Sequence, residues 1–299
     1  MHPVTRAAIA ISALTVVGAG AAPLYVLLAS EAVVERRYPL PVIEEPLAAS
    51  EASARGAHLA AITGCGDCHG ANFQGRRESI GPLRLWSSNL RIDARQMSAG
   101  EFERALRRGL APDATSLWDM PSEDYMYMNE RDVADLYAFL RSLGAAGNAG
   151  RKPLWDLRAQ FALVRGRIVP AVIATRDAPS SLDLGPRYDG GRYLARIACS
   201  ECHGTDLGGS SAAPDLIRVR GYSRPAFFDL LRRGWGTHGR QLKTMKRLAA
   251  VRFHAFADYE IMALFDYLSA RARAPAAMFA RAKANELRRR ELIMLENDD

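Results

Sequence analysis

Helical spacing dominates the pattern of apolar and polar positions along the 299 residues of this chain. Two aromatic-rich apolar segments, 132–140 and 259–268, have acidic starts, which favours helices beginning at those points. No run of alternating apolar and polar residues stands out as a set of strands. The pattern therefore predicts an all-α fold, and the length suits two domains of about 100 residues each plus connecting segments.

The N-terminal pattern is different, because residues 7–29 contain no formally charged side chain. A stretch of this length can span a bilayer, which needs about 20 residues, and Arg6 before it fits the positive-inside rule. A cleavable signal peptide is the alternative, since Ala19 to Ala21 offers small residues for a signal peptidase. The apolar run continues through 23–28, which favours a retained anchor, and either interpretation predicts that the remainder is exported.

An internal repeat divides the remainder of the chain. The string Phe-x-x-x-Leu-Arg-Arg-Gly occurs at 102–109 and at 227–234, and a methionine stands eleven residues beyond each glycine. One module used twice explains this spacing. The expected organisation is an anchor or signal (1–30), a tether (31–53), a first module (54–145), a linker packed on the modules (146–186), a second module (187–273) and a helical tail (274–299).

All four cysteines lie in two copies of Cys-x-x-Cys-His, at 65–69 and 199–203. Covalent attachment of haem c needs this string: each thiol adds to one vinyl group, and the histidine binds iron from the proximal side. The sequence therefore predicts two covalently bound haem c groups. The expected attachment residues are Cys65, Cys68, Cys199 and Cys202, and the expected proximal iron ligands are His69 and His203.

Three other uses of the cysteines explain the pattern less well. A zinc site would need four ligands at two paired spacings, and it leaves the histidine after each pair unexplained. A thioredoxin-like redox site would lie near a βαβ pattern, and no such pattern is present. Disulfides closed within four-residue loops would be strained.

The distal iron ligands are predicted to be Met120 and Met245, which occupy the same place in the two copies of the repeat. An isolated methionine is ordinarily core filler. Met126 and Met128 stand close to Met120 and are expected to pack. Met262 lies inside the last helix of the second module and is expected to be core. Met97 has no partner in the repeat.

The remaining histidines are weaker candidates. His58 precedes the first cysteine string, and Tyr193 holds the corresponding place in the second copy, so we expect His58 to have a packing or surface role. His238 and His254 bracket Met245, so bis-histidine ligation of the second haem is an alternative. The first module has no histidine in the matching region.

The repeated motifs resemble the class I cytochrome c fold. They are Cys-x-x-Cys-His-Gly, Met-Pro at 120–121, Ala-Pro-Asp-Leu at 213–216, and the closing Leu-x-x-Phe/Tyr-Leu helices. Over residues 31–272 the chain is similar to membrane-anchored dihaem cytochromes c of the bacterial periplasm. The resemblance implies that the helix before each haem string crosses the closing helix of its module. Residues of these crossing helices are then Leu59, Leu194, Tyr137 and Phe265.

The second module departs from the family pattern at Met245, which is followed by Lys246 and not by proline. The chain also resembles the cytochrome subunits of membrane-bound dehydrogenases, although those carry three haems and this chain has two haem strings.

Charge is divided unevenly between the two modules. Residues 31–150 carry 13 basic and 17 acidic side chains, a net of −4, and residues 151–299 carry 26 and 16, a net of +10. Such a division could steer two different redox proteins to the two modules, although the charged faces could also simply be solvated. Nucleic acid is not an expected partner. Candidates to offset the haem propionates are Arg107, Arg108, Arg232 and Arg233.

The function that these features favour is electron transfer and not enzymatic catalysis. The expected protein is a dihaem c-type cytochrome between a donor and an acceptor of a respiratory or photosynthetic chain. It would lie on the periplasmic side of the bacterial inner membrane, or free in the periplasm if the N-terminus is cleaved. The alternatives are a cytochrome subunit fixed in a membrane-bound dehydrogenase or similar complex, and a dihaem peroxidase, which would need a displaceable distal ligand.

Overall fold

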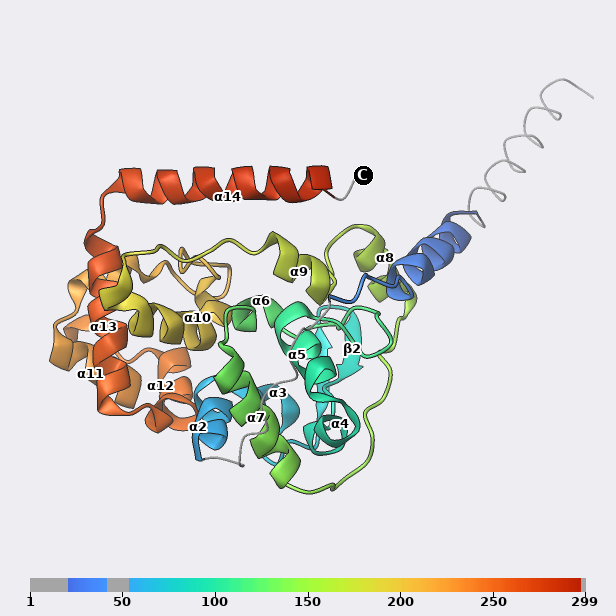
Figure 1. Ribbon diagram of the computed structural model, residues 1–299, viewed down its shortest axis with the longest axis horizontal. Helices are drawn as coiled ribbons and strands as arrows, with labels where there is room; N and C mark the ends of the chain where they lie inside the picture. Colours follow the sequence, from blue (N-terminus) through green and yellow to red (C-terminus); the bar gives the residue numbers. More distant parts are fainter. Residues whose placement is uncertain (1–20, 42–53, 297–299) are drawn as a thin grey trace, which may run out of the picture.

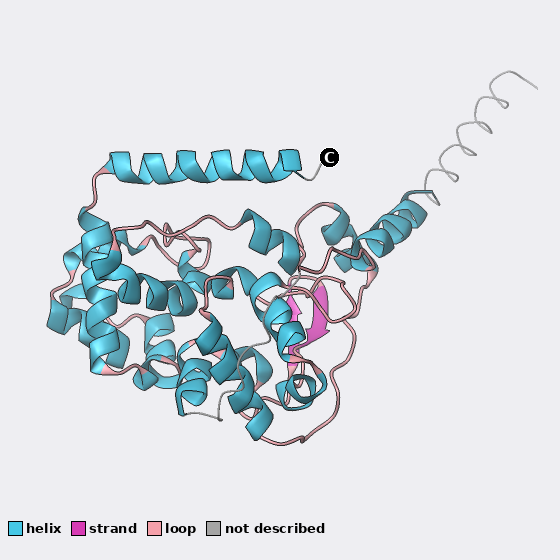
Figure 2. Ribbon diagram, viewed as in Figure 1, coloured by secondary structure: helices cyan, strands magenta, loops and turns pink. Residues whose placement is uncertain are grey.

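The computed structural model describes residues 21–41 and 54–296 of the chain. Over these residues the protein is mostly helical, as the apolar pattern predicts (Figure 2). The pattern did not predict the antiparallel hairpin of β1 (Arg77–Ile80) and β2 (Leu83–Trp86), which turns at Gly81 with a φ of 54°.

The first half of the fold, described over residues 54–145, contains six helices and begins and ends with the two that cross, α2 (Ala54–Ile62) and α7 (Glu130–Ser142). Helix α5 (Ala99–Arg108) begins with a capping box in which Ser98 and Glu101 bond each other's backbone N–H, and it ends at Gly109 in the left-handed region. Asn129 caps the closing helix, because its side chain accepts a hydrogen bond from the Asp132 N–H. The other helices are α3 (Cys65–His69), α4 (Leu90–Gln96) and α6 (Ser122–Tyr125).

The second half has a similar order of helices. Its counterpart of α5 is capped by Ser223 and ends at Gly234, again in the left-handed region, so the repeated Leu-Arg-Arg-Gly string forms the same helix end twice. The elements are η1 (Pro186–Tyr188), α10 (Asp189–His203), η2 (Leu216–Gly221), α11 (Arg224–Arg233), η3 (Thr237–Gly239), α12 (Lys243–Val251), η4 (Phe253–Ala255) and α13 (Asp258–Arg273).

Each half is organised by a close helix crossing, α2 with α7 and α10 with α13, as the resemblance implied. A glycine stands at both crossing points. A Cβ on Gly56 would lie 2.1 Å from the carbonyl oxygen of Asp135, and one on Gly191 would lie 2.0 Å from that of Ala263. Only glycine lets the backbones approach so closely. The two crossings fix the helices that carry the cysteine strings.

The two halves share one apolar core and contact each other through matching elements. Helix α6 of the first half packs on α10 of the second, and η4 of the second half packs on α2 of the first. His58 Nε2 lies 2.9 Å from Glu260, and the Tyr193 hydroxyl donates to Asp132 at 2.6 Å. His58 therefore has the packing role expected of it, as a contact between the halves.

The segment between the halves contacts both: its helices lie against the first half, and near its end the Leu182 carbonyl accepts a hydrogen bond from the Tyr267 hydroxyl of the second half at 2.8 Å. The segment forms α8 (Leu157–Val164) and α9 (Ala171–Asp177), and α9 packs on α5 and α6. Trp155 meets Trp118 edge to face, and Ala159 joins Leu83 and Leu85 of the hairpin in a small second core.

The described part of the predicted tether also contacts the first half. Residues 21–34 are helical, Arg37 donates to the Asp113 carbonyl at 3.0 Å, and the Tyr38 N–H donates to the Ala114 carbonyl at 2.9 Å. Within residues 21–41 and 54–296, no helix has the length and apolarity to cross a membrane. Residues 7–20 of the predicted anchor and 42–53 of the tether lie outside the described residues.

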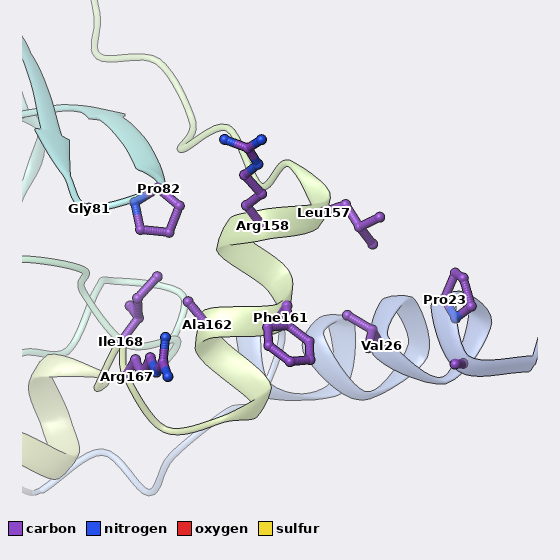
Figure 3. A pocket seen from close by; sticks show the side chains of 11 residues that line it. Pro23, Val26, Gly81, Pro82, Leu157, Arg158, Phe161, Ala162, Arg167 and Ile168 are labelled. Atoms are coloured by element: carbon purple, nitrogen blue, oxygen red, sulfur yellow. The ribbon is translucent and has the colours of Figure 1, made fainter. Parts of the chain in front are cut away.

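Two features lie at the edges of the molecule. The C-terminal helix α14 (Ala276–Glu296) runs along one side of the body (Figure 1). An open, mainly apolar pocket lies between residues 21–34, α8 and the hairpin turn, where Val26 and Phe161 approach each other (Figure 3). Its lining contains no residue of either cysteine string.

Candidate haem-binding sites

The first cysteine string forms the short helix α3, which follows the left-handed residue Gly64. Cys65 and Cys68 are therefore one turn apart on the same face of the helix. Both are free thiols, as attachment to two vinyl groups requires. Gly70 ends the helix with a φ of 77°, which turns the chain away immediately after His69.

The second string forms the last turn of α10, and Cys199 and Cys202 again lie on one face as free thiols. Here the helix is continuous from the crossing glycine to the string. Eight positions separate Gly191 from Cys199, whereas nine separate Gly56 from Cys65, and the additional residue falls at the break between α2 and α3. Apart from this break, the two strings have the same local form.

Both string histidines are oriented by a backbone carbonyl. His69 Nδ1 lies 2.8 Å from the Ser88 oxygen, and His203 Nδ1 lies 2.6 Å from the Pro214 oxygen. A carbonyl only accepts hydrogen bonds, so Nδ1 carries the proton and Nε2 keeps its lone pair for a metal. Burial lowers the pKa of both imidazoles, although the carbonyl bonds raise it, which favours the neutral ring that iron needs.

The backbone around the strings is held by two matching sets of hydrogen bonds. The N–H groups of Gly75 and Gly209 donate to the carbonyls of the string histidines, each at 2.8 Å. The Ser87 hydroxyl donates to the Cys68 carbonyl at 2.6 Å, and the Ser210 hydroxyl donates to the Cys202 carbonyl at 2.5 Å. The same loop geometry is thus built twice.

The cysteines are protonated thiols at neutral pH. Burial, together with the nearby charge of Glu201, raises the pKa of Cys68 to about 11, and burial raises that of Cys199 to about 12. Zinc ligands and reactive dithiols are thiolates, so this environment suits neither use. Among the described residues, no group of three or more His, Cys, Asp or Glu side chains is placed to hold a metal ion. The residues fit covalent haem attachment.

The two predicted methionine ligands follow equivalent backbone contacts. The Leu117 N–H donates to the Gly109 carbonyl at 2.7 Å, the Leu242 N–H donates to the Gly234 carbonyl at 2.9 Å, and a methionine stands three residues later in both cases. Met120 lies in a loop, whereas Met245 lies in the first turn of α12. Both are partly buried against the shared core. Their assignment as ligands stays a prediction.

The competing residues fall into two groups. Met128 is 0 % exposed and packs in the core, which confirms its expected role. Met262 is 41 % exposed, so the interpretation of this residue as core is wrong, because its side of α13 faces away from the helices that α13 crosses. His238 and His254 are both exposed.

Comparison with known families gives a match to the Cytochrome c family model over residues 53–144. These residues form a cytochrome c domain. The matched range contains the first cysteine string and Met120, and a cytochrome c domain implies covalently bound haem c and electron transfer. Among curated proteins, no significant match was found.

An ion triad around a buried arginine, which was not predicted from the sequence, joins the cytochrome c domain to the second half, and its carboxylates, Asp67 and Glu201, are 24 % and 34 % exposed. The Arg252 side chain is 6 % exposed, and its guanidinium bonds Asp67 of the first string and Glu201 of the second, both at 2.6 Å. One signal could have found this site. Both cysteine strings carry an acidic residue immediately before their second cysteine.

Proposed function

We propose that the protein is a dihaem c-type cytochrome that passes electrons between two redox partners. The proposal rests on one observation above all. The second half repeats the arrangement of the cytochrome c domain, with two free thiols one turn apart followed by a histidine whose Nδ1 donates to a carbonyl. A second haem at Cys199 and Cys202 follows from this equivalence.

Haem c supplies a one-electron iron couple when it is bound. The residues of the chain would hold the porphyrin and bind the iron. The cysteines hold the porphyrin edge, the carbonyl-bound histidines offer a fixed, neutral Nε2, and Met120 and Met245 are the proposed distal ligands. If Met120 and Met245 bind the two irons, they would occupy the position that a peroxidase needs for its substrate, which supports a carrier over a peroxidase.

The setting and partners that we propose follow from the sequence. The uncharged N-terminal stretch supports a location of the haem-bearing halves on the periplasmic side of a bacterial membrane, and the acidic and basic halves support different protein partners. A fixed place in a larger complex is the second candidate, because α14 carries exposed Met278 and Leu287 along one edge of the molecule (Figure 1). Co-purification after mild detergent extraction separates these two, since a carrier leaves alone.

The test begins with the haem content of the purified protein, from the pyridine haemochromogen spectrum and the intact mass. Two haems per chain are expected, and one haem refutes the proposal. Spectroelectrochemistry of Met120→Ala and Met245→Ala then checks the distal ligands. Each variant should lower one of the two midpoint potentials, because a thioether ligand favours ferrous iron. Met262→Ala is the matched control, since this methionine is exposed on α13.

A further inference from the structure

We propose that Arg252 is a positioning residue that locks the two haem strings together and couples their redox potentials. This inference rests on the proposed function, because it requires a haem on each string. Its starting point is a feature that haem attachment leaves unexplained. Attachment sets no requirement on the spacer residues, yet Asp67 and Glu201 occupy the same spacer position in the two strings.

The guanidinium uses separate nitrogens for the two carboxylates. Its Nε donates to Asp67 Oδ2 and its Nη1 donates to Glu201 Oε2, both at 2.6 Å. A rigid, planar fork with several donors can hold two carboxylates in fixed directions, which a lysine ammonium cannot do. The strings cannot move relative to each other without breaking one of these bonds.

The surrounding backbone is shaped to receive the arginine. Arg252 follows α12 in the second half, and η4, which comes next, packs on α2 of the first half. On the other side, a Cβ on Gly64 would lie 2.0 Å from Arg252 Nε. Glycine at 64, directly before the first string, therefore leaves the space that the guanidinium occupies.

The triad is also an electrical link between the strings. Burial lowers the pKa of Arg252, but the bonds to Glu201 and Asp67 hold that pKa above its ordinary value, so the guanidinium stays charged. Asp67 and Glu201 immediately precede Cys68 and Cys202, so the guanidinium that bonds these two carboxylates lies beside both cysteine strings. One positive charge therefore acts at both attachment sites. The triad as a whole carries a net charge of −1.

The repeat alone does not produce the triad, because the two halves carry different residues at the position of Arg252. Arg252 stands five residues before Ala257, which caps α13. The residue five positions before Asn129, the cap of α7, is Asp124. The second half therefore has Arg252 at a position where the first half has the buried carboxyl of Asp124.

The test uses the full-length holoprotein and measures three quantities: haems per chain, the exciton couplet in the Soret circular dichroism, and the two midpoint potentials. Arg252→Gln removes the cation and should abolish or invert the couplet. It should also move both potentials negative, by at least threefold in each reduction equilibrium, about 30 mV for one electron. Arg252→Lys keeps the charge without the fork, so it should retain the potentials and weaken the couplet.

Asp67→Asn and Glu201→Gln provide the opposite perturbation with nearly unchanged shapes, and they serve if Arg252→Gln does not fold. Both should move the potentials positive. Arg271→Gln is the matched control. It breaks the ion pair between Arg271, which is buried, and Asp215, which is 39 % exposed; the pair measures 2.9 Å and lies within the second half. The control should lower stability and keep the couplet.

Two results would overturn the proposal, and they differ from a failure of the proposed function. The first is a two-haem Arg252→Gln protein with the wild-type couplet and potentials. The second is a shift of the same sign in Arg252→Gln and Asp67→Asn, since a charge effect must reverse. A wild-type protein with a single haem refutes the dihaem proposal itself.

Discussion

Replacing Gly191 by alanine tests the crossing that positions the second cysteine string. The added Cβ would lie 2.0 Å from the Ala263 carbonyl oxygen and 2.7 Å from the Tyr267 Cβ. The first is helix backbone, and Tyr267 is fully buried with its hydroxyl donating to the Leu182 carbonyl at 2.8 Å. Neither neighbour is the free end of a flexible side chain, so α10 and α13 must separate.

The size of the effect follows from opposing contributions. Alanine gains about 1 kcal/mol over glycine in a helix interior. Relieving the clash opens the seam by ~1 Å, which forfeits a quarter to a half of each dispersion contact. With about 40 such contacts at ~0.15 kcal/mol each, the loss is about 1.5–3 kcal/mol. Residual overpacking adds about 1–3 kcal/mol. The net expectation is destabilisation by about 2–4 kcal/mol.

Gly190 provides the matched control one position earlier in the same helix, because a Cβ there meets nothing within 4 Å. Urea unfolding of the holoproteins, followed by far-UV circular dichroism, measures the free energy of unfolding for each variant. Gly190→Ala should be neutral or up to about 1 kcal/mol more stable than wild type. If Gly191→Ala is as stable as Gly190→Ala, the close crossing of α10 and α13 is refuted.

Two further predictions concern the contact between the halves. Burial, with the charges of Glu123 and Glu201, raises the pKa of Asp124 to about 8 against the attraction of Arg252. The unfolded chain therefore releases this proton first, so the contribution of Asp124 to stability falls between about pH 4 and pH 8. Asp124→Asn should unfold at higher urea than wild type at pH 8.5 and at similar urea at pH 4.5; equal midpoints at both pH values would contradict this. Gly64→Ala should cost more than about 1 kcal/mol, because it combines a φ of 73° with a clash against Arg252. It should also weaken the Soret couplet, as is expected of Arg252→Lys; an unchanged couplet would show that the guanidinium keeps its place.

Local patterns in the sequence predicted the helical elements and the repeated strings. The Leu-Arg-Arg-Gly string marks a helix end because its glycine takes a left-handed conformation in both copies. The hairpin was missed for a local reason. Each strand has four residues; β1 begins with Arg77 and Glu78 and has no apolar alternation, and in β2 the alternation of Leu83, Arg84 and Leu85 is too short to stand out.

The contacts between distant segments could not be predicted in the same way. Arg252 is 185 positions from Asp67 in the chain, and nothing in its neighbourhood of the sequence indicates that the two pair. The docking of Arg37 and Tyr38 on the loop at 113–115 is a second example, because the sequence predicts only a tether over residues 31–53 and does not indicate where it binds. Such contacts depend on how the halves pack, which a repeat pattern does not specify.

The packing of the two halves resembles a symmetric dimer within one chain. Asp132 and Glu260 hold the same position in the first turn of α7 and α13, and each accepts a hydrogen bond from the other half, from Tyr193 and His58 respectively. Such reciprocal contacts are the mark of an isologous interface. Two identical copies would give both sites the same environment and leave no preferred direction for an electron. Arg252 bonds both strings at 2.6 Å and acts on them alike, so the equality is broken on the other side, where the first half has the buried carboxyl of Asp124 at the position that Arg252 holds in the second.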